Sequence, residues 1–216
     1  MIYLDRVRES RWFKPGLQAV VALAVVGVLI LAGWTWYRWQ QSRGLAALAD
    51  ADQLVQLVDK PDAPPGTRER AIQALEVVIA DHPRLSALPQ AAYQLGNLKY
   101  AAGQYPAARA AYELAIAKGA SRALRVLAGL GIGYAWEAEK NYAAAAQAHA
   151  SSVKGLGPGD FLFEEALMAQ ARAEELAGKP AAAVEIYQRL LRDVPKSRHA
   201  EDLRNRVASL KSRSGP

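Results

Sequence analysis

Three histidines, His82, His149 and His199, are the residues best suited to metal binding or acid–base chemistry in this chain of 216 residues. They lie far apart in the sequence, the chain contains no cysteine, and no His-Glu-x-x-His pattern is present. A zinc site needs three or four such ligands at short, characteristic spacings. We therefore predict no metal centre. His149 falls in register with the helical repeat described below, and we interpret it as a packing residue.

The glycines of the stretch GLGIG, residues 129–133, superficially resemble a phosphate-binding loop. They lie inside a predicted helix, in register with the same repeat, so helix packing explains them better. No Walker A, Gly-x-Ser-x-Gly or dinucleotide-binding pattern occurs elsewhere. The sequence therefore predicts a protein that is not an enzyme, with no cofactor and no small-molecule substrate.

The chain is basic, with 27 Lys and Arg against 21 Asp and Glu and a pI near 9.6. Beyond residue 14 the balance is 23 basic to 19 acidic residues, and the charges are interspersed along predicted helices. Such a distribution is typical of a solvated surface. We predict that nucleic acid is not a partner.

One apolar run, residues 17–37, dominates the N-terminal part of the chain. At about 1.5 Å per residue it spans roughly 32 Å as a helix, the thickness of a bilayer's hydrocarbon core. A buried core helix is usually shorter, and a cleaved signal peptide has a shorter apolar stretch followed by small residues. Here the end of the run and the residue pair after it carry Trp34, Trp36, Tyr37 and Trp39 instead, which suits an interfacial aromatic belt. We predict an uncleaved transmembrane anchor in contact with the lipid bilayer.

The charges that flank this run indicate its orientation. Four basic residues precede it in the first 14 positions, and only Arg38 and Arg43 occur in the 20 residues after Tyr37. The positive-inside rule then places residues 1–16 in the cytoplasm as a basic tail. We predict a single-pass protein of the bacterial inner membrane, with a juxtamembrane linker at 38–44 and a periplasmic C-terminal domain.

The remainder of the chain contains an internal repeat. Ala71, Ala108, Ala145 and Ala183 are separated by 37, 37 and 38 residues, and a larger side chain follows each of them four positions later. These spacings place the repeated residues on one helix face. Alternating strand patterns are missing, so the composition predicts an all-α fold.

A second helix is predicted before each helix that carries one of these alanines. Gly96, Gly133 and Ala171 lie on these preceding helices where the two helices of a hairpin approach most closely. The pattern resembles the tetratricopeptide repeat, whose small-residue and aromatic sites are occupied by Leu95-Gly96, Gly103-Gln104-Tyr105, Ala108, Tyr112 and Ala115. That family's period is about 34 residues, and the present one is longer. The resemblance implies an α-solenoid of about four helical hairpins that share one core.

The resulting domain prediction is a repeat domain at 45–195 followed by a capping helix and tail at 196–216. The repeats are placed at about 45–84, 87–119, 120–155 and 160–195. Leu203, Val207 and Leu210 give the last segment an apolar face at helical spacing, as the end of a solenoid requires.

The family resemblance also implies a partner-binding groove lined by the first helix of each hairpin. Its predicted residues are Gln90, Tyr93, Asn97, Tyr100, Leu130, Tyr134, Glu137, Glu165, Met168, Arg172 and Glu175. Asn97 matches an asparagine with which family members grip a peptide carboxylate. The Lys and Arg of such a clamp are replaced by Tyr93, Leu130 and Tyr134, so we do not expect carboxylate capture. Tyr and Met suit exposed apolar segments instead.

The order of basic tail, anchor and exported repeats resembles the ancillary subunit of the Sec translocon. This resemblance implies a chaperone-like or adaptor role toward other proteins, namely exported unfolded chains, the translocon or envelope chaperones. The alternative is a scaffold subunit of an envelope assembly, such as cytochrome c maturation, pilus or secretion machinery.

Overall fold

The computed structural model describes residues 13–213, so residues 1–12 of the predicted basic tail and residues 214–216 lie outside it. Within this range the secondary structure is entirely helical, and the predicted all-α class is confirmed. The helices are α2 (Phe13–Val58), α3 (Thr67–Asp81), α4 (Leu88–Ala101), α5 (Tyr105–Ala117), α6 (Arg122–Ala138), α7 (Tyr142–Val153), α8 (Phe163–Leu176), α9 (Pro180–Asp193) and α10 (Ala200–Arg213).

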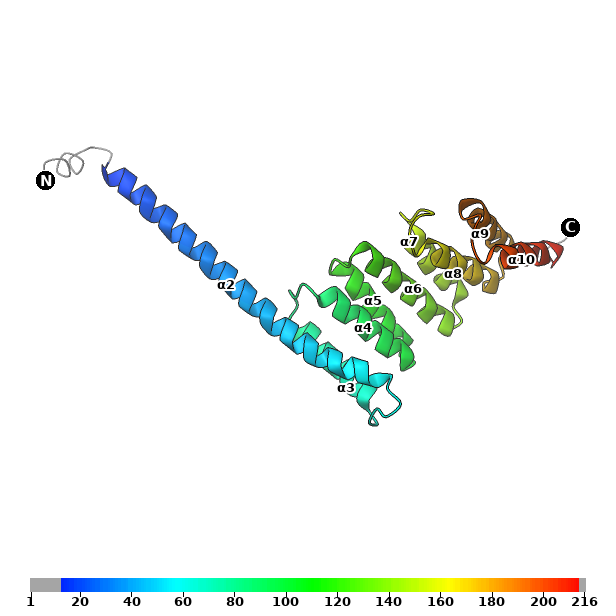
Figure 1. The fold of residues 1–216 in the computed structure, drawn as a ribbon, viewed down its shortest axis with the longest axis horizontal. Coiled ribbons are helices and arrows are strands. Elements are labelled where there is room, and N and C mark those ends of the chain that lie inside the picture. Colours follow the sequence, from blue (N-terminus) through cyan, green and yellow to red (C-terminus); the bar gives the residue numbers. More distant parts are fainter. Residues whose placement is uncertain (1–12, 214–216) are drawn as a thin grey trace.

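Successive helices pair as antiparallel hairpins that stack into a solenoid (Figure 1). The C-terminal part of α2 pairs with α3, and the pairs α4–α5, α6–α7 and α8–α9 follow. The last helix, α10, packs on α9 and buries Leu203 and Leu210. The first helices α4, α6 and α8 also contact one another directly, which places them together on one face of the stack.

The longest element, α2, runs without a break for 46 residues and extends far beyond the solenoid (Figure 1). Its most apolar window contains no buried residue, and Leu29 is 66% exposed. By length and composition it could cross a membrane, and a signal sequence would meet the same test. The sequence suggests a separate linker at 38–44, but the structure continues the helix through it, since no proline or glycine pair interrupts these residues.

A side-chain clamp fixes α2 to the first inter-hairpin connection. The Gln41 amide donates to the Arg84 carbonyl at 2.7 Å, and its oxygen accepts from the Ser86 backbone amide at 3.0 Å. One turn further along, Gly44 lies so close to Leu85 that an added Cβ would be 2.9 Å from Leu85 Cδ1. These contacts hold α2 against the first inter-hairpin connection.

Small residues at fixed positions hold the hairpins together. Ala71, Ala108, Ala145 and Ala183 are all 0% exposed, as the repeat register requires. A Cβ on Gly96 would lie 2.5 Å from the Tyr112 ring, so only glycine allows this tyrosine to pack between α4 and α5. The absent side chain of Gly96 thus leaves the space that the ring of Tyr112 fills in the close-packed interface.

Candidate functional site

The first helices α4, α6 and α8, together with α10, line two adjoining hollows on the same face of the solenoid. We call their combined surface the groove. The smaller hollow has a volume of about 240 Å³ and the larger about 860 Å³. Tyr134 and Glu165 line both hollows, so the groove is continuous from the second repeat to the cap.

Tyrosines dominate the smaller hollow. Tyr93 and Tyr112 lie with ring centroids 5.7 Å apart, and Tyr100 meets Tyr105 edge-on at 5.5 Å. The Tyr112 hydroxyl donates to Asn97 Oδ1 at 2.8 Å, and burial raises the pKa of this phenol. Asn97 thus uses its carbonyl oxygen in a contact within the protein, and this contact leaves the two N–H donors of its exposed side-chain amide unused.

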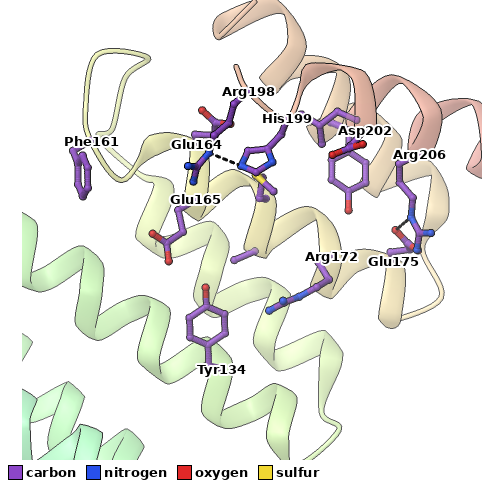
Figure 2. A pocket seen from close by; sticks show the side chains of 14 residues that line it. Tyr134, Phe161, Glu164, Glu165, Arg172, Glu175, Arg198, His199, Asp202 and Arg206 are labelled. Atoms are coloured by element: carbon purple, nitrogen blue, oxygen red, sulfur yellow. Dashed lines mark hydrogen bonds and ion pairs between the residues drawn. The ribbon is translucent and has the colours of Figure 1, made fainter. Parts of the chain in front are cut away.

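The larger hollow combines an apolar floor with paired charges (Figure 2). Met168, Ala169 and Leu203 supply apolar surface, and Glu175 forms an ion pair with Arg206 across α8 and α10. Glu165 has no ion-pair partner among the described residues. The surface therefore offers apolar contacts bordered by both signs of charge.

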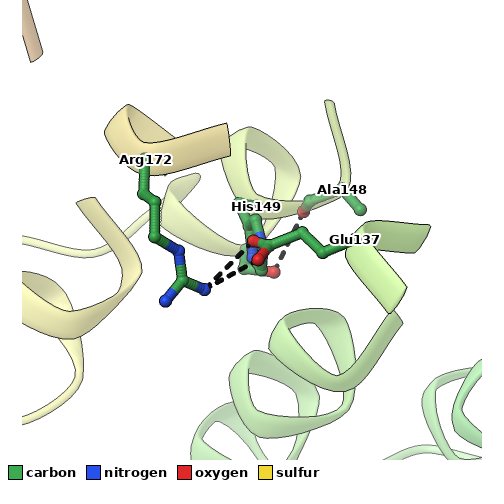
Figure 3. Close-up of polar contacts among 5 residues, drawn as sticks. Glu137, Ala148, His149 and Arg172 are labelled. Carbon is green, nitrogen blue, oxygen red and sulfur yellow. Dashed lines mark hydrogen bonds and ion pairs between the residues drawn. The ribbon is translucent and has the colours of Figure 1, made fainter. Parts of the chain in front are cut away.

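Glu137 joins three helices next to the groove (Figure 3), and its partner Arg172 lines the larger hollow. It accepts from Arg172 Nη2 on α8 at 2.8 and 3.2 Å, and from His149 Nε2 on α7 at 2.9 Å. Burial alone would raise the pKa of the Glu137 carboxyl, but the hydrogen bond from His149 and the charge and hydrogen bond of Arg172 outweigh it and lower this pKa. We call these three residues the Glu137 triad.

His149 is 0% exposed, and its ring meets Tyr134 edge-on at 5.1 Å. A Cβ on Gly133 would collide with this ring, so the glycine in the preceding helix creates the space that the histidine fills. A carboxylate only accepts hydrogen bonds, which places the proton on Nε2, and Nδ1 is buried without a partner. The prediction that His149 packs the repeat interface agrees with this environment.

The structure brings most of the predicted groove residues together. The smaller hollow includes Tyr93, Asn97, Tyr100, Leu130, Tyr134 and Glu165, and the larger includes Tyr134, Glu165, Met168, Arg172 and Glu175. Gln90 and Glu137 line neither hollow: Gln90 is exposed, and Glu137 is occupied by its triad. Whether these residues bind a partner stays a prediction.

Leu130 lines the smaller hollow from a buried position. It is only 2% exposed and packs in the core cluster that contains Phe163 and Leu167 of the next hairpin. The neighbouring first helix α8 covers the flank of α6 on which Leu130 lies. It therefore supplies the floor of the smaller hollow.

Sequence reasoning missed part of the groove at its C-terminal end. Arg198, Asp202 and Arg206 line the larger hollow from the polar side of the cap, and their spacing of four residues was the available signal. Phe161 borders the same hollow and is 97% exposed (Figure 2). An aromatic residue in a loop rich in glycine and proline was the signal for this exposed ring.

The histidines do not form a common site. No group of three His, Cys, Asp or Glu residues that could hold a metal ion occurs within residues 13–213. His82 follows α3, His149 is buried in α7, and His199 precedes α10 and accepts from Arg198 Nε at 3.0 Å.

Comparisons with known structures agree with the fold. Two crystal structures of putative kinesin light chain nearly identical TPR-like repeats from Podosopora anserina, one of them carrying a single substitution, are similar to this chain. Each is 17% identical and covers 81% of this chain and 97% of the other, with TM-scores of 0.51 and 0.52. At this identity the likeness concerns the fold alone. None of the curated proteins compared with the chain matches it.

Two family descriptions match the sequence. Residues 165–197 match the tetratricopeptide repeat, and residues 10–174 match the tetratricopeptide repeat-like domain. The second match spans well over half of the 216 residues and includes the apolar part of α2. The chain therefore belongs to the tetratricopeptide repeat-like domain family, whose members typically bind other proteins.

Proposed function

We propose that this chain is a non-catalytic, membrane-anchored module for protein–protein interaction in the bacterial inner membrane. The observation that carries the proposal is α2, which exposes its apolar half and continues without a break into the domain that bears the groove. An exposed apolar surface of this length has a high free energy in water, and a lipid bilayer removes it from water. Trp34, Trp36 and Trp39 remain exposed where the apolar run ends, as an interfacial belt would be.

The groove is the surface through which the module would bind. Tyr100 is 36% exposed and Tyr134 and Met168 are half-buried, so adaptable apolar and aromatic side chains remain accessible. Such side chains suit an extended polypeptide with apolar residues, because tyrosine provides contact area at low entropic cost and methionine adapts its shape. Both signs of charge at the groove wall favour no single highly charged ligand.

The role we favour is that of a chaperone-like or adaptor subunit near the Sec translocon. Four basic residues before the apolar run against two after it support an exported position for the repeats. There the groove would meet newly exported chains, and the anchor would raise its local concentration near the site of emergence. The alternative role is that of a scaffold that holds one partner in an envelope assembly, and the crosslinking experiment below distinguishes the two roles.

Sidedness is tested by thiol labelling, because the native chain contains no cysteine. A Gln147→Cys variant places one thiol at an exposed position of α7. Labelling of intact spheroplasts with a membrane-impermeant maleimide is expected to modify it. Labelling only after lysis would put the repeats in the cytoplasm and remove exported chains from the list of partners.

Groove binding is tested with a photo-crosslinking amino acid at Tyr100, and the matched control carries it at Glu113. Glu113 is exposed on the second helix of the same hairpin, away from the groove. A chaperone is expected to crosslink to many exported chains from position 100 and to few from position 113. One stoichiometric partner would support the scaffold role, and equal crosslinking from both positions would refute binding through the groove.

A further inference from the structure

The connections between hairpins lie at the end of the solenoid from which α2 extends. Helix α2 is the first helix of the first hairpin, and α4, α6 and α8 run in the same general direction (Figure 1). The chain therefore returns to the same end before each of these helices begins. We call this end the anchor-side edge and define it by the connecting residues 82–87, 118–121 and 154–162.

This edge is positively charged. Its three basic residues, all exposed, are Arg84, Lys118 and Lys154, and none of them has a carboxylate partner among the described residues. One acidic residue, Asp160, accompanies them. Its charge is balanced by Arg122 in the first turn of α6, at 2.9 Å.

The opposite edge has no such excess. It consists of the turns inside the hairpins, residues 59–66, 102–104, 139–141 and 177–179. These turns contain three basic residues, Lys60, Lys140 and Lys179, and three acidic residues, Asp59, Asp62 and Glu139. The excess of positive charge is therefore found at the end of the solenoid from which α2 extends and not at the opposite end.

A hollow of about 620 Å³ opens at the anchor-side edge between α6 and α7. Arg122, Arg125 and Lys154 border it, and Val126, Ile132 and Leu156 belong to its apolar lining. Arg122 also donates to the Gly155 carbonyl, which draws the connection after α7 toward the start of α6. Cations around an apolar floor match the chemistry of a phospholipid, which has an anionic headgroup above an acyl chain.

The first connection already lies at the level of the aromatic belt of α2. Trp36 and Tyr37 line a hollow of about 510 Å³ together with residues 81–85, and the Gln41 clamp holds this connection in place. A transmembrane helix tilts by about 20° on average. Tilt of α2 toward the repeats would bring the later connections closer to the same plane.

We propose that the anchor-side edge docks on anionic phospholipid headgroups of the bilayer that α2 crosses. The solenoid then lies along the membrane surface, and its groove lies close to that surface. This inference rests on the proposed membrane anchoring. Each Lys or Arg near an anionic lipid surface strengthens binding about fivefold. Three such charges would therefore change the ratio of docked to undocked domains about a hundredfold.

The test uses the full-length protein in nanodiscs that contain spin-labelled lipid as a fluorescence quencher. Single cysteines replace Ala123 and Ala138, two exposed residues at opposite ends of α6, and each receives a fluorophore. With phosphatidylglycerol added to phosphatidylcholine, quenching is expected at position 123 and not at 138. High salt is expected to reduce it, since exposed charges are screened.

The charge variant Arg84→Gln/Lys118→Gln/Lys154→Gln removes one cation from each connection and breaks none of the ion pairs described here. It is expected to lower quenching at position 123 to the level of position 138. The control Lys60→Gln/Lys140→Gln/Lys179→Gln removes the same charge from the opposite edge and is expected to leave quenching unchanged. Equal quenching at positions 123 and 138, or no effect of the first variant, would overturn the proposal.

A third label at Leu29→Cys separates this inference from membrane anchoring itself. Quenching at position 29 without quenching at 123 would refute only edge docking. Absence of quenching at position 29 would refute the anchor and edge docking together.

Discussion

The Glu137→Gln substitution is the sharpest probe of the Glu137 triad, which joins α6, α7 and α8 next to the groove. It preserves the shape of the side chain and removes its charge, while Arg172 and His149 keep their positions on α8 and α7. One side chain thereby loses its interaction with two neighbouring helices. We expect the variant to fold and to be less stable at neutral pH.

The magnitude follows from the exposure of the two partners. Arg172 is 52% exposed, so its ion pair contributes about 1 kcal/mol or less. The bond from His149 is better shielded, since the His149 side chain is 0% and the Glu137 side chain 14% exposed, and a hydrogen bond to a charged group contributes about 1.5–3 kcal/mol. Because the glutamine oxygen retains a weaker hydrogen bond, we expect a total loss of about 2 kcal/mol in the free energy of unfolding.

The stability difference between wild type and Glu137→Gln is expected to depend on pH in one direction only. The folded-state pKa of Glu137 lies below its ordinary value of 4.5, so its stabilisation is complete above that pH and is lost as the pH falls through the folded-state pKa. Urea unfolding of the full-length protein in detergent, followed by circular dichroism, should show the deficit at pH 7 and its disappearance in acid. Exposed Glu113→Gln serves as the control and should match the wild type. Equal stability of Glu137→Gln and wild type at pH 7, or a deficit that persists in strong acid, would refute the reasoning.

Three further variants test packing and the groove rim. Gly133→Ala is expected to destabilise the protein by about 1–3 kcal/mol in urea unfolding, because the new methyl group collides with the buried His149 ring; Gly33→Ala, with open space around it, should not. Leu190→Ala is expected to cost about 2–5 kcal/mol in the same measurement, since this side chain is 0% exposed in the largest core cluster, and a loss below 1 kcal/mol would contradict that packing. Phe161→Ala is expected to leave the unfolding curve unchanged and to weaken crosslinking from the groove, and a destabilised variant would show that the exposed ring packs in solution.

The repeat architecture could be predicted because it is encoded by local spacing. Alanines 37 or 38 residues apart identified the buried face, and all four have no exposed surface. Gly96 could likewise be placed at a close contact, because only a small residue allows helices to approach an aromatic ring.

Contacts between different hairpins could not be predicted in the same way. Leu130 faces the core because α8 covers its flank, and the Glu137 triad needs three helices in one arrangement. Both depend on how one hairpin rotates relative to the next, which the spacing within a hairpin does not determine. The unbroken course of α2 was missed because a change from apolar to polar composition was interpreted as a change of element.

Because α2 is unbroken, the direction in which the groove faces depends on the number of residues in this helix. Each residue added to a helix turns everything beyond it by about 100° and shifts it by about 1.5 Å. If two residues were inserted after the aromatic belt and the Gln41 clamp were released, the groove would rotate by about 200° around the axis of α2 and face roughly the opposite way. Four inserted residues would rotate it by about 400°, which is within about 40° of its original direction. Under the proposed membrane anchoring, the length of this one helix would therefore determine whether the groove or the opposite face of the repeats is turned toward a partner in the same membrane.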